Sequence, residues 1–228
     1  MGSAGTEGPI VYETMSGRIF LVRHGQTYSN VEHLLDTRPP GAELTERGRG
    51  QATDVGQELA ELTAGRKVRF YCSIALRAQQ TAMLAAESFA KATGQIRVPV
   101  EVKTGIHEIF AGDFEMDGSE DAHRSYMVAL RGWLDGDENA CMEGGETYRN
   151  VLERYQPVIE EIAANLGEDE DAVVVSHGAA IRVVSRHATG VDADFAYTGY
   201  MANGRFTVME PNGQPFGKWT LKRWADTD

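Results

Sequence analysis

Three strand-like runs of this 228-residue chain are each followed, within five residues, by a cation or an imidazole. Runs of this length that are rich in β-branched and aromatic residues are typical of buried strands. Open α/β sheets bind ligands beyond the carboxyl ends of their strands, so we predict that these side chains meet at one sheet edge. The runs and the basic residues that follow them are 19–22 with Arg23 and His24, 69–72 with Arg77, and 173–175 with His177.

The residue types at these strand ends suit the chemistry of phosphate. A neutral imidazole such as His24 can attack phosphorus, and the guanidinium groups of Arg23 and Arg77 can fork onto phosphate oxygens. The amide of Asn30 adds a donor, and the backbone N–H of Gly178 adds another at the predicted start of a helix. A strand followed by a polar turn is the alternative for Arg23-His24 alone, but the repetition at three strand ends favours a site.

Six segments, in this order, resemble the histidine phosphatase superfamily, the phosphoglycerate-mutase-like proteins. The pair formed by Arg-His-Gly and Ser-His-Gly is fairly specific, and the ordered set is a strong signal over residues 18 to 190. The segments are RHGQT at 23–27 with Asn30, LTERGRGQA at 44–52, SIALRAQQTA at 73–82, Glu108 with Gly112 and Glu115, GGET at 144–147, and VSHG at 175–178.

The resemblance implies an α/β fold of three layers, with a mostly parallel sheet and helices on both of its faces. It also implies roles for five side chains. His24 is the expected nucleophile. It is expected to become phosphorylated, and water then releases the phosphate. Glu108 is the expected general acid, Arg23 and Arg77 hold the phosphoryl group, and His177 is expected to donate to the oxygens of that group.

Several further residues are candidates for binding phosphate or substrate. Asn30 and Gly178 are expected donors, and Thr27 is expected to brace the pocket. Arg38 lies in the loop after Asn30 and could contact an anionic substrate, although a solvated surface arginine is the commoner case. The remaining histidines (33, 107, 123 and 187) lack metal-ligand spacing, so we predict neither a metal site nor a cofactor.

Composition narrows the class of partner. The formal net charge of −12 argues against a nucleic-acid binder, and no apolar run is long enough to cross a membrane. Residues 107–171 hold 18 Asp and Glu against 4 Lys and Arg, which is typical of a solvated helical surface. Only Cys72 and Cys141 are present, which favours a reducing cytoplasm over a disulfide framework.

The chain reads as a flexible N-terminal tail over 1–16 and a single domain over 17–228. Residues 103–146 are an irregular, acidic excursion that we expect to cover the site as a lid. Pro39, Pro40 and Gly41 make 35–43 a loop. The remaining predicted elements are strands over 69–73, 98–102 and 172–176, helices that follow Thr45 and span 76–92, 119–134, 147–166 and 179–189, and a closing antiparallel pair over 205–210 and 219–224.

The function predicted first is a metal-independent phosphomonoesterase that acts on a small phosphorylated metabolite through a phosphohistidine. A 2,3-bisphosphoglycerate-dependent phosphoglycerate mutase is the alternative, and only that reading requires 2,3-bisphosphoglycerate as a cofactor. The third alternative is a non-catalytic phosphate-binding regulatory module. Two departures from the family pattern, loop 35–43 and Met116 in place of a common glycine, leave the identity of the substrate undecided. The oligomeric state is also undecided, and a homodimer is possible because dimers occur in the family.

Overall fold

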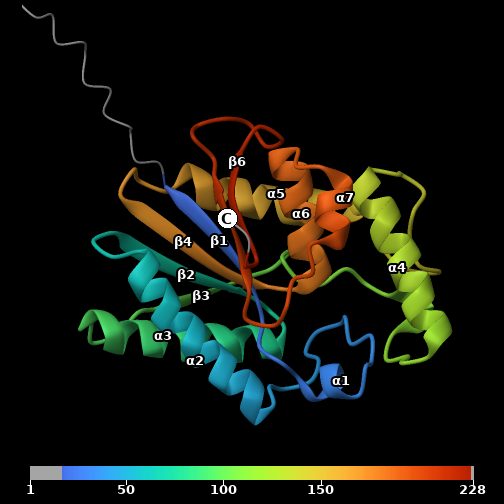
Figure 1. The fold of residues 1–228 in the computed structure, drawn as a ribbon, viewed down its shortest axis with the longest axis horizontal. Helices are drawn as coiled ribbons and strands as arrows, with labels where there is room; N and C mark the ends of the chain where they lie inside the picture. The colour runs from blue at the N-terminus through green and yellow to red at the C-terminus, as the bar shows by residue number, and fades with distance from the viewer. Residues whose placement is uncertain (1–16, 227–228) are drawn as a thin grey trace, which may run out of the picture.

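A six-stranded sheet forms the centre of the computed structural model, which describes residues 17–226 (Figure 1). In the order β3-β2-β4-β1-β5-β6, the first four strands are parallel and the last two form an antiparallel edge. The predicted α/β class, the mostly parallel sheet and the closing edge pair are therefore confirmed. The strands are β1 Arg18–Arg23, β2 Lys67–Ser73, β3 Val100–Lys103, β4 Glu170–Ser176, β5 Phe206–Glu210 and β6 Thr220–Trp224.

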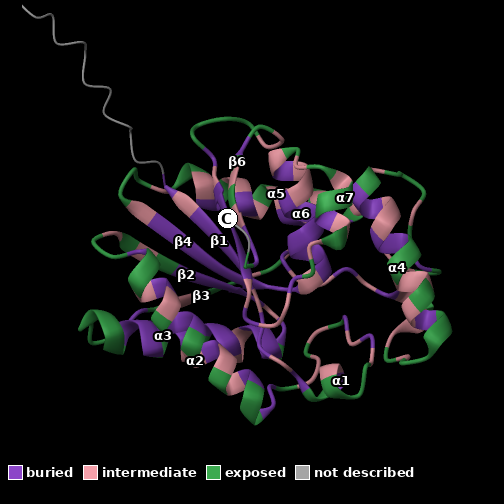
Figure 2. Ribbon diagram, viewed as in Figure 1, coloured by how far each residue is buried: buried purple, intermediate pink, exposed green. Residues whose placement is uncertain are grey.

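Helices cover both faces of this sheet, and the buried strands lie between them (Figure 2). Alternation along β1 explains the two cores, because successive side chains of a strand point to opposite faces. Phe20 and Val22 pack with α2 and α3, whereas Ile19 and Leu21 pack on the other side with α5 and α6. The helices are α1 Tyr28–Val31, α2 Glu46–Leu62, α3 Leu76–Thr93, α4 Glu120–Asp135, α5 Tyr148–Ala164, α6 Gly178–Thr189 and α7 Ala193–Thr198, with a 3₁₀ turn η1 over Gly112–Phe114.

Local signals in the sequence explain most of the helix ends. The Thr45 hydroxyl accepts from Gly48 N at 3.1 Å and begins α2, and the Ser119 hydroxyl accepts from Ala122 N at 3.2 Å and begins α4. Gly190 ends α6 in the left-handed conformation that glycine adopts freely. The short helix α7 was not predicted from the sequence, although Asp192 caps it.

A buried carboxylate lies at the amino ends of β1 and β4, opposite the strand ends that carry Arg23 and Ser176. Asp171 is fully buried and pairs with Arg18 in the sheet register. Its oxygens lie 2.6 Å from Arg18 Nη2 and 2.9 Å from Arg66 Nε. Two guanidinium groups thus balance one buried negative charge, which is the condition for retaining it inside a protein.

The loop 35–43 is tied to the segment after η1 by Glu115. Its carboxylate accepts from the backbone N–H of Thr37 at 2.8 Å and of Arg38 at 2.9 Å, and it also bonds the Thr37 hydroxyl. The next residue, Met116, has φ of 61°, a left-handed conformation that favours glycine. This explains why glycine suits the position, and Met116 is half exposed there.

Some expectations fall outside what the structure describes. The predicted tail over 1–16 lies outside the described residues, and the single domain over 17–228 stays a prediction. Within residues 17–226, no helix combines the length and the apolar character needed to cross a membrane. Cys72 is buried and Cys141 is exposed, both as free thiols, and the cytoplasmic location stays a prediction.

Candidate active site

The carboxyl ends of β1, β2 and β4 lie side by side and open onto a cavity of about 630 Å³. Ser176 is the register partner of Arg23, so the ends of β1 and β4 are level. The structure therefore brings together the three strand ends that the sequence singled out. The predicted site residues that line this cavity are Arg23, His24, Thr27, Asn30, Arg77, Glu108 and Gly178.

His24 begins the turn after β1 and is almost fully buried. Its backbone N–H donates to Ser176 O at 3.0 Å, which continues the sheet one residue past the strand. Gly25 then meets Gly48 of α2 so closely that a Cβ on Gly25 would lie 2.4 Å from Gly48 O. Only glycine allows this approach, which holds the first turn of α2 against the histidine.

The imidazole of His24 is oriented for attack through one nitrogen. Nδ1 lies 2.7 Å from Gly25 O, which can only accept, so Nδ1 carries the proton and Nε2 keeps its lone pair. Burial lowers the pKa of His24 well below 6.5, and the positive charges of Arg77 and Arg23 lower it further. The ring is therefore neutral and nucleophilic at and below neutral pH.

A titration of the histidine ring signals checks this electrostatic assignment. We expect the His24 and His177 rings to keep neutral chemical shifts at pH 5.5, because their pKa values lie well below 6.5. As the pH falls below 6.5 the unfolded chain binds protons at these positions and the folded chain does not. The free energy of unfolding should thus fall by about 1 kcal/mol for each ring between pH 7.0 and pH 5.5.

NMR with assignment through His24→Gln and His177→Gln measures the shifts, and urea unfolding between pH 7.0 and 5.5 measures the slope. Each substitution should reduce the fall in the free energy of unfolding between these two pH values by about 1 kcal/mol. Midpoints near pH 6.5 for both rings would contradict the assignment.

Two buried guanidinium N–H groups at the cavity have no hydrogen-bond partner among the described residues. Arg23 donates through Nη1 to Met201 O at 2.6 Å, yet its buried Nε is unpartnered. Arg77 donates through Nε to His177, yet its buried Nη1 is unpartnered and lies 3.7 Å from Asp36 Oδ1. Unsatisfied buried donors are costly, so a site that keeps two of them beside a nucleophile is suited to an oxyanion.

His177 differs from the expectation that it donates to the transferring group. Arg77 Nε can only donate, so the 3.3 Å contact makes His177 Nδ1 an acceptor, and Nε2 donates to Ser73 Oγ at 2.9 Å. Both ring nitrogens are occupied, and the fully buried ring does not line the cavity. Its ring centre lies 5.2 Å from that of His24, so His177 holds Arg77 Nε close to the nucleophile.

Asn30 and Thr27 form a capping box at the start of α1, which fixes the amide of Asn30. Asn30 Oδ1 accepts from Thr27 N at 3.1 Å and from Asn203 Nδ2 at 3.2 Å, so its own Nδ2 is left as a donor at the cavity. Asn203 also donates to His24 O at 3.0 Å. Sequence reasoning missed Asn203, because it reaches the site from the loop before β5.

Arg38 was predicted as a possible substrate contact, but the structure places it elsewhere. Glu115 fixes its backbone, and its exposed guanidinium lies over the Phe110 ring, 5.0 Å from the centroid. It is not among the residues that line the cavity. The predicted lid segment 103–146 does reach the site: Glu108 enters from the loop after β3, and His123, Tyr126 and Met127 enter from α4.

Glu108 is held at the N-terminus of α6 by three backbone N–H groups. Its Oε1 accepts from Ile109 N at 2.9 Å and from Ala180 N at 2.9 Å. Its Oε2 accepts a single, longer bond of 3.2 Å from Ala179 N. Oε2 therefore retains a lone pair that could carry a proton toward the cavity.

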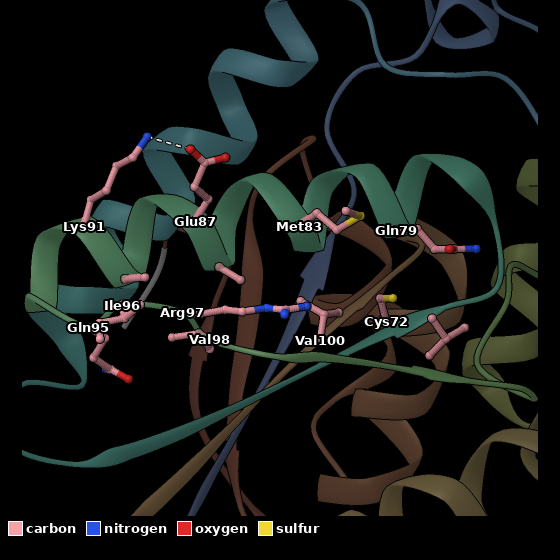
Figure 3. A pocket seen from close by; sticks show the side chains of 13 residues that line it. Cys72, Gln79, Met83, Glu87, Lys91, Gln95, Ile96, Arg97, Val98 and Val100 are labelled. Atoms are coloured by element: carbon pink, nitrogen blue, oxygen red, sulfur yellow. Dashed lines mark hydrogen bonds and ion pairs between the residues drawn. The ribbon is translucent and has the colours of Figure 1, made fainter.

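A second hollow, of about 460 Å³, lies between α3 and the edge strand β3 (Figure 3). Met83, Val98 and Val100 line it, and its charged pair, Lys91 and Glu87, is closed on itself at 2.7 Å. It offers neither an imidazole nor an unpartnered buried guanidinium among its lining residues. The chemistry of the strand ends belongs to the larger cavity. The described residues also contain no group of three or more His, Cys, Asp or Glu placed to hold a metal ion.

Comparison with known proteins identifies the family. The family model described as the histidine phosphatase superfamily (branch 1) matches residues 19–227. The chain belongs to this superfamily. The resemblance given by the motifs is thus confirmed, and the fold is that of the phosphoglycerate-mutase-like proteins.

Relatives of this histidine phosphatase include enzymes that are named for different activities. It is 27% identical to the adenosylcobalamin/alpha-ribazole phosphatase of Escherichia coli (strain K12) over 86% of this chain and 90% of that one. It is 29% identical to a 2,3-bisphosphoglycerate-dependent phosphoglycerate mutase of Sinorhizobium fredii over 74% and 77%. A mycobacterial glucosyl-3-phosphoglycerate phosphatase, solved with VO3, superposes with a TM-score of 0.71 at 25% identity, covering 92% and 99%.

These similarities show a phosphatase of the histidine phosphatase type. The prediction of an enzyme is therefore confirmed, and the alternative of a non-catalytic binding module is not supported. The match is broad, because both the sequence family and the solved structures cover the sheet and the cavity together.

Proposed function

We propose that this histidine phosphatase hydrolyses phosphomonoesters of small metabolites, without a metal ion, through a phosphohistidine at His24. The observation that carries the proposal is the neutral His24 ring, with Nε2 unprotonated, beside the unpartnered buried donors of Arg23 and Arg77. Phosphoryl transfer needs mainly positioning and stabilisation of charge on the phosphoryl oxygens. A fixed nucleophile and two guanidinium groups supply both.

In the first step His24 Nε2 forms a bond to phosphorus as the ester P–O bond breaks. The leaving oxygen takes the electron pair of that bond and a proton from Glu108 Oε2. In the second step a water oxygen attacks the phosphohistidine, passes its proton to the Glu108 carboxylate and releases inorganic phosphate. His24 then regains its lone pair, and Glu108 is again an acid.

The role of Glu108 predicts a dependence on the leaving group. Glu108→Gln should lower kcat/KM, which reports the first step, by about 10²–10³-fold for ethyl phosphate, because an alkoxide needs a proton to leave. For p-nitrophenyl phosphate the loss should be under about tenfold, since nitrophenolate leaves unprotonated. Steady-state kinetics on both substrates measure this difference. Equal losses on the two substrates would show that Glu108 does not protonate the leaving group.

Trapping the intermediate tests the proposed function itself. Enzyme mixed with p-nitrophenyl phosphate in EDTA and quenched in alkali should gain one phosphoryl mass on the peptide that contains His24. An acid-quenched sample should lose it, because phosphohistidine is labile in acid. Turnover that EDTA abolishes, or a phosphoryl group on another residue, would overturn the proposal.

The substrate class is supported by what the relatives are named for. Alpha-ribazole phosphatase and glucosyl-3-phosphoglycerate phosphatase are both named as phosphatases of small phosphorylated molecules. The cavity of about 630 Å³ has room for a metabolite beyond the phosphate group.

Phosphoglycerate mutase activity is the second candidate, favoured by the similarity to the mutase of Sinorhizobium fredii. A mutase must keep its phosphohistidine from water, whereas a phosphatase must admit water. Interconversion of 3- and 2-phosphoglycerate that depends on added 2,3-bisphosphoglycerate, and is faster than phosphate release, would establish the mutase. Phosphate release alone supports the phosphatase.

A further inference from the structure

We propose that the substrate carries a second anionic group, a carboxylate or a further phosphate, and that Arg182 binds it. This inference rests on the proposed function, because it concerns the same cavity. Arg182 enters the cavity from α6, one turn beyond Gly178. It is distinct from the arginines that flank His24.

The guanidinium of Arg182 is held rigidly by the backbone that follows α6. Its Nε and Nη2 donate to Ala196 O at 3.0 and 2.9 Å, and Nη2 also bonds Tyr197 O. For Nη1 no hydrogen-bond partner is found in the described part of the chain, and this atom is not fully buried. Nη1 therefore presents its two N–H groups to the cavity that Arg182 lines.

The positive charge of Arg182 is met by backbone carbonyls of α7 and not by a carboxylate. The residue is only 7% exposed, and within residues 17–226 no carboxylate lies within ion-pair distance of it. The carboxylates of the cavity are engaged elsewhere: Glu108 with α6, and Asp36 with Ser29, Ala42 and Arg77. Buried charges are normally paired, so a ligand that brings a negative group here would restore the balance.

The surroundings of Arg182 fit an anion rather than a neutral group. Burial lowers the pKa of Arg182, and the charge of Arg23 lowers it further, whereas the side chain of Tyr126 raises it. Burial raises the pKa of Tyr126, so its hydroxyl keeps its proton and can donate. Tyr200 adds a hydroxyl 3.3 Å from Arg23 Nη1. Donors thus extend from the phosphate site to Arg182.

Apolar side chains also line this cavity. Leu34, Leu35 and Met127 line the cavity together with the tyrosines. A short hydrocarbon or sugar spacer between two anionic groups would match this distribution, because it would lie against the apolar side chains. The substrate class is therefore a phosphomonoester with a second anion at a fixed separation.

A ladder of matched substrates tests the inference and finds the separation. O-phosphoryl ω-hydroxy acids with two, three and four carbons are compared with ethyl, propyl and butyl phosphate, and diol bisphosphates form a further arm. At the best length we expect kcat/KM of the wild type to be at least about tenfold higher for the substrate that carries the second anionic group than for its alkyl phosphate counterpart, mainly through KM. The carboxylate and bisphosphate arms show which second anion is accepted.

Variants assign the preference to Arg182. Arg182→Gln should bring the ratio close to one, and Arg182→Lys should leave an intermediate ratio, because it keeps the charge but loses the fork. Arg186→Gln removes a cation from the same helix outside the cavity lining, so its ratio should match the wild type. The ratio is insensitive to a general loss of active enzyme, and Arg182→Lys covers the case in which Arg182→Gln fails to fold.

The possible outcomes are distinguishable. If the wild type hydrolyses p-nitrophenyl phosphate but shows a ratio near one at every length in both arms, the second-anion site is wrong and the proposed function stands. A preference that persists in Arg182→Gln and Arg182→Lys also overturns the assignment to Arg182. No turnover on any phosphomonoester would instead overturn the proposed function.

Discussion

His24→Ala is expected to lower kcat/KM for p-nitrophenyl phosphate by at least about 10⁴-fold. The substitution removes the only group in the proposed mechanism that forms a covalent bond to phosphorus. Water cannot replace it efficiently, because Glu108 acts as the acid in the first step and the proposed mechanism contains no base that would activate water at that stage. Initial rates near pH 6 in EDTA measure the loss.

His123→Ala is the matched control, because His123 lines the same cavity and its Nε2 bonds His33 O at 2.8 Å, away from the groups of the proposed mechanism. Its loss should stay below about tenfold. Circular dichroism checks that both variants fold. A folded His24→Ala variant with more than a few per cent of wild-type activity would mean that another group attacks phosphorus.

Arg77→Gln is expected to lower kcat/KM for p-nitrophenyl phosphate by about 10²–10³-fold. The substitution removes the unpartnered Nη1 donor and the positive charge that lowers the pKa of His24. It also frees His177 Nδ1, since Arg77 Nε donates to it. Arg77→Lys should lose less, because it keeps the charge and loses only the planar fork. Steady-state kinetics and the affinity for inorganic phosphate as a competitive inhibitor measure both variants.

Arg38→Gln is the control for this prediction. Arg38 lies over Phe110 outside the cavity lining, so its removal should change kcat/KM by less than about threefold. If Arg38→Gln weakens phosphate binding as much as Arg77→Gln does, the loop 35–43 must move over the site during turnover. In that case the structure would describe only one of its states.

The strand ends could be predicted because the information is local. Short strand-like runs, each with a glycine or an arginine nearby, predict buried strands that end at a functional edge, and β1, β2 and β4 follow that pattern. The caps of α2 and α4 are equally local, since a hydroxyl three residues before a backbone N–H suffices. Hence the fold and the placement of Arg23, His24 and Arg77 were available from the sequence.

The partners of each side chain were not available from the sequence, because they depend on contacts between distant segments. His177 was expected to face the transferring group, but Ser73 and Arg77, about a hundred residues away, occupy both of its nitrogens. Arg38 lies outside the cavity because its backbone N–H donates to Glu115 and its guanidinium packs on Phe110, both in the acidic segment 103–146. Asn203 and Tyr126 carry no motif, so only the tertiary structure shows that they belong to the cavity.

The buried Asp171 bears on how finely the site is aligned. The central residues of β1 and β4 are apolar on both faces, so their pattern alone would tolerate a slip of the two strands by one residue. Asp171 opposes such a slip, because it meets Arg18 at the amino ends of the same two strands. Five residues further on, about 17 Å at 3.3 Å per residue, that same alignment sets Arg23 level with Ser176 and the nucleophile beside it. A charge pair far from the reacting groups thus fixes the strand register that positions the catalytic residues.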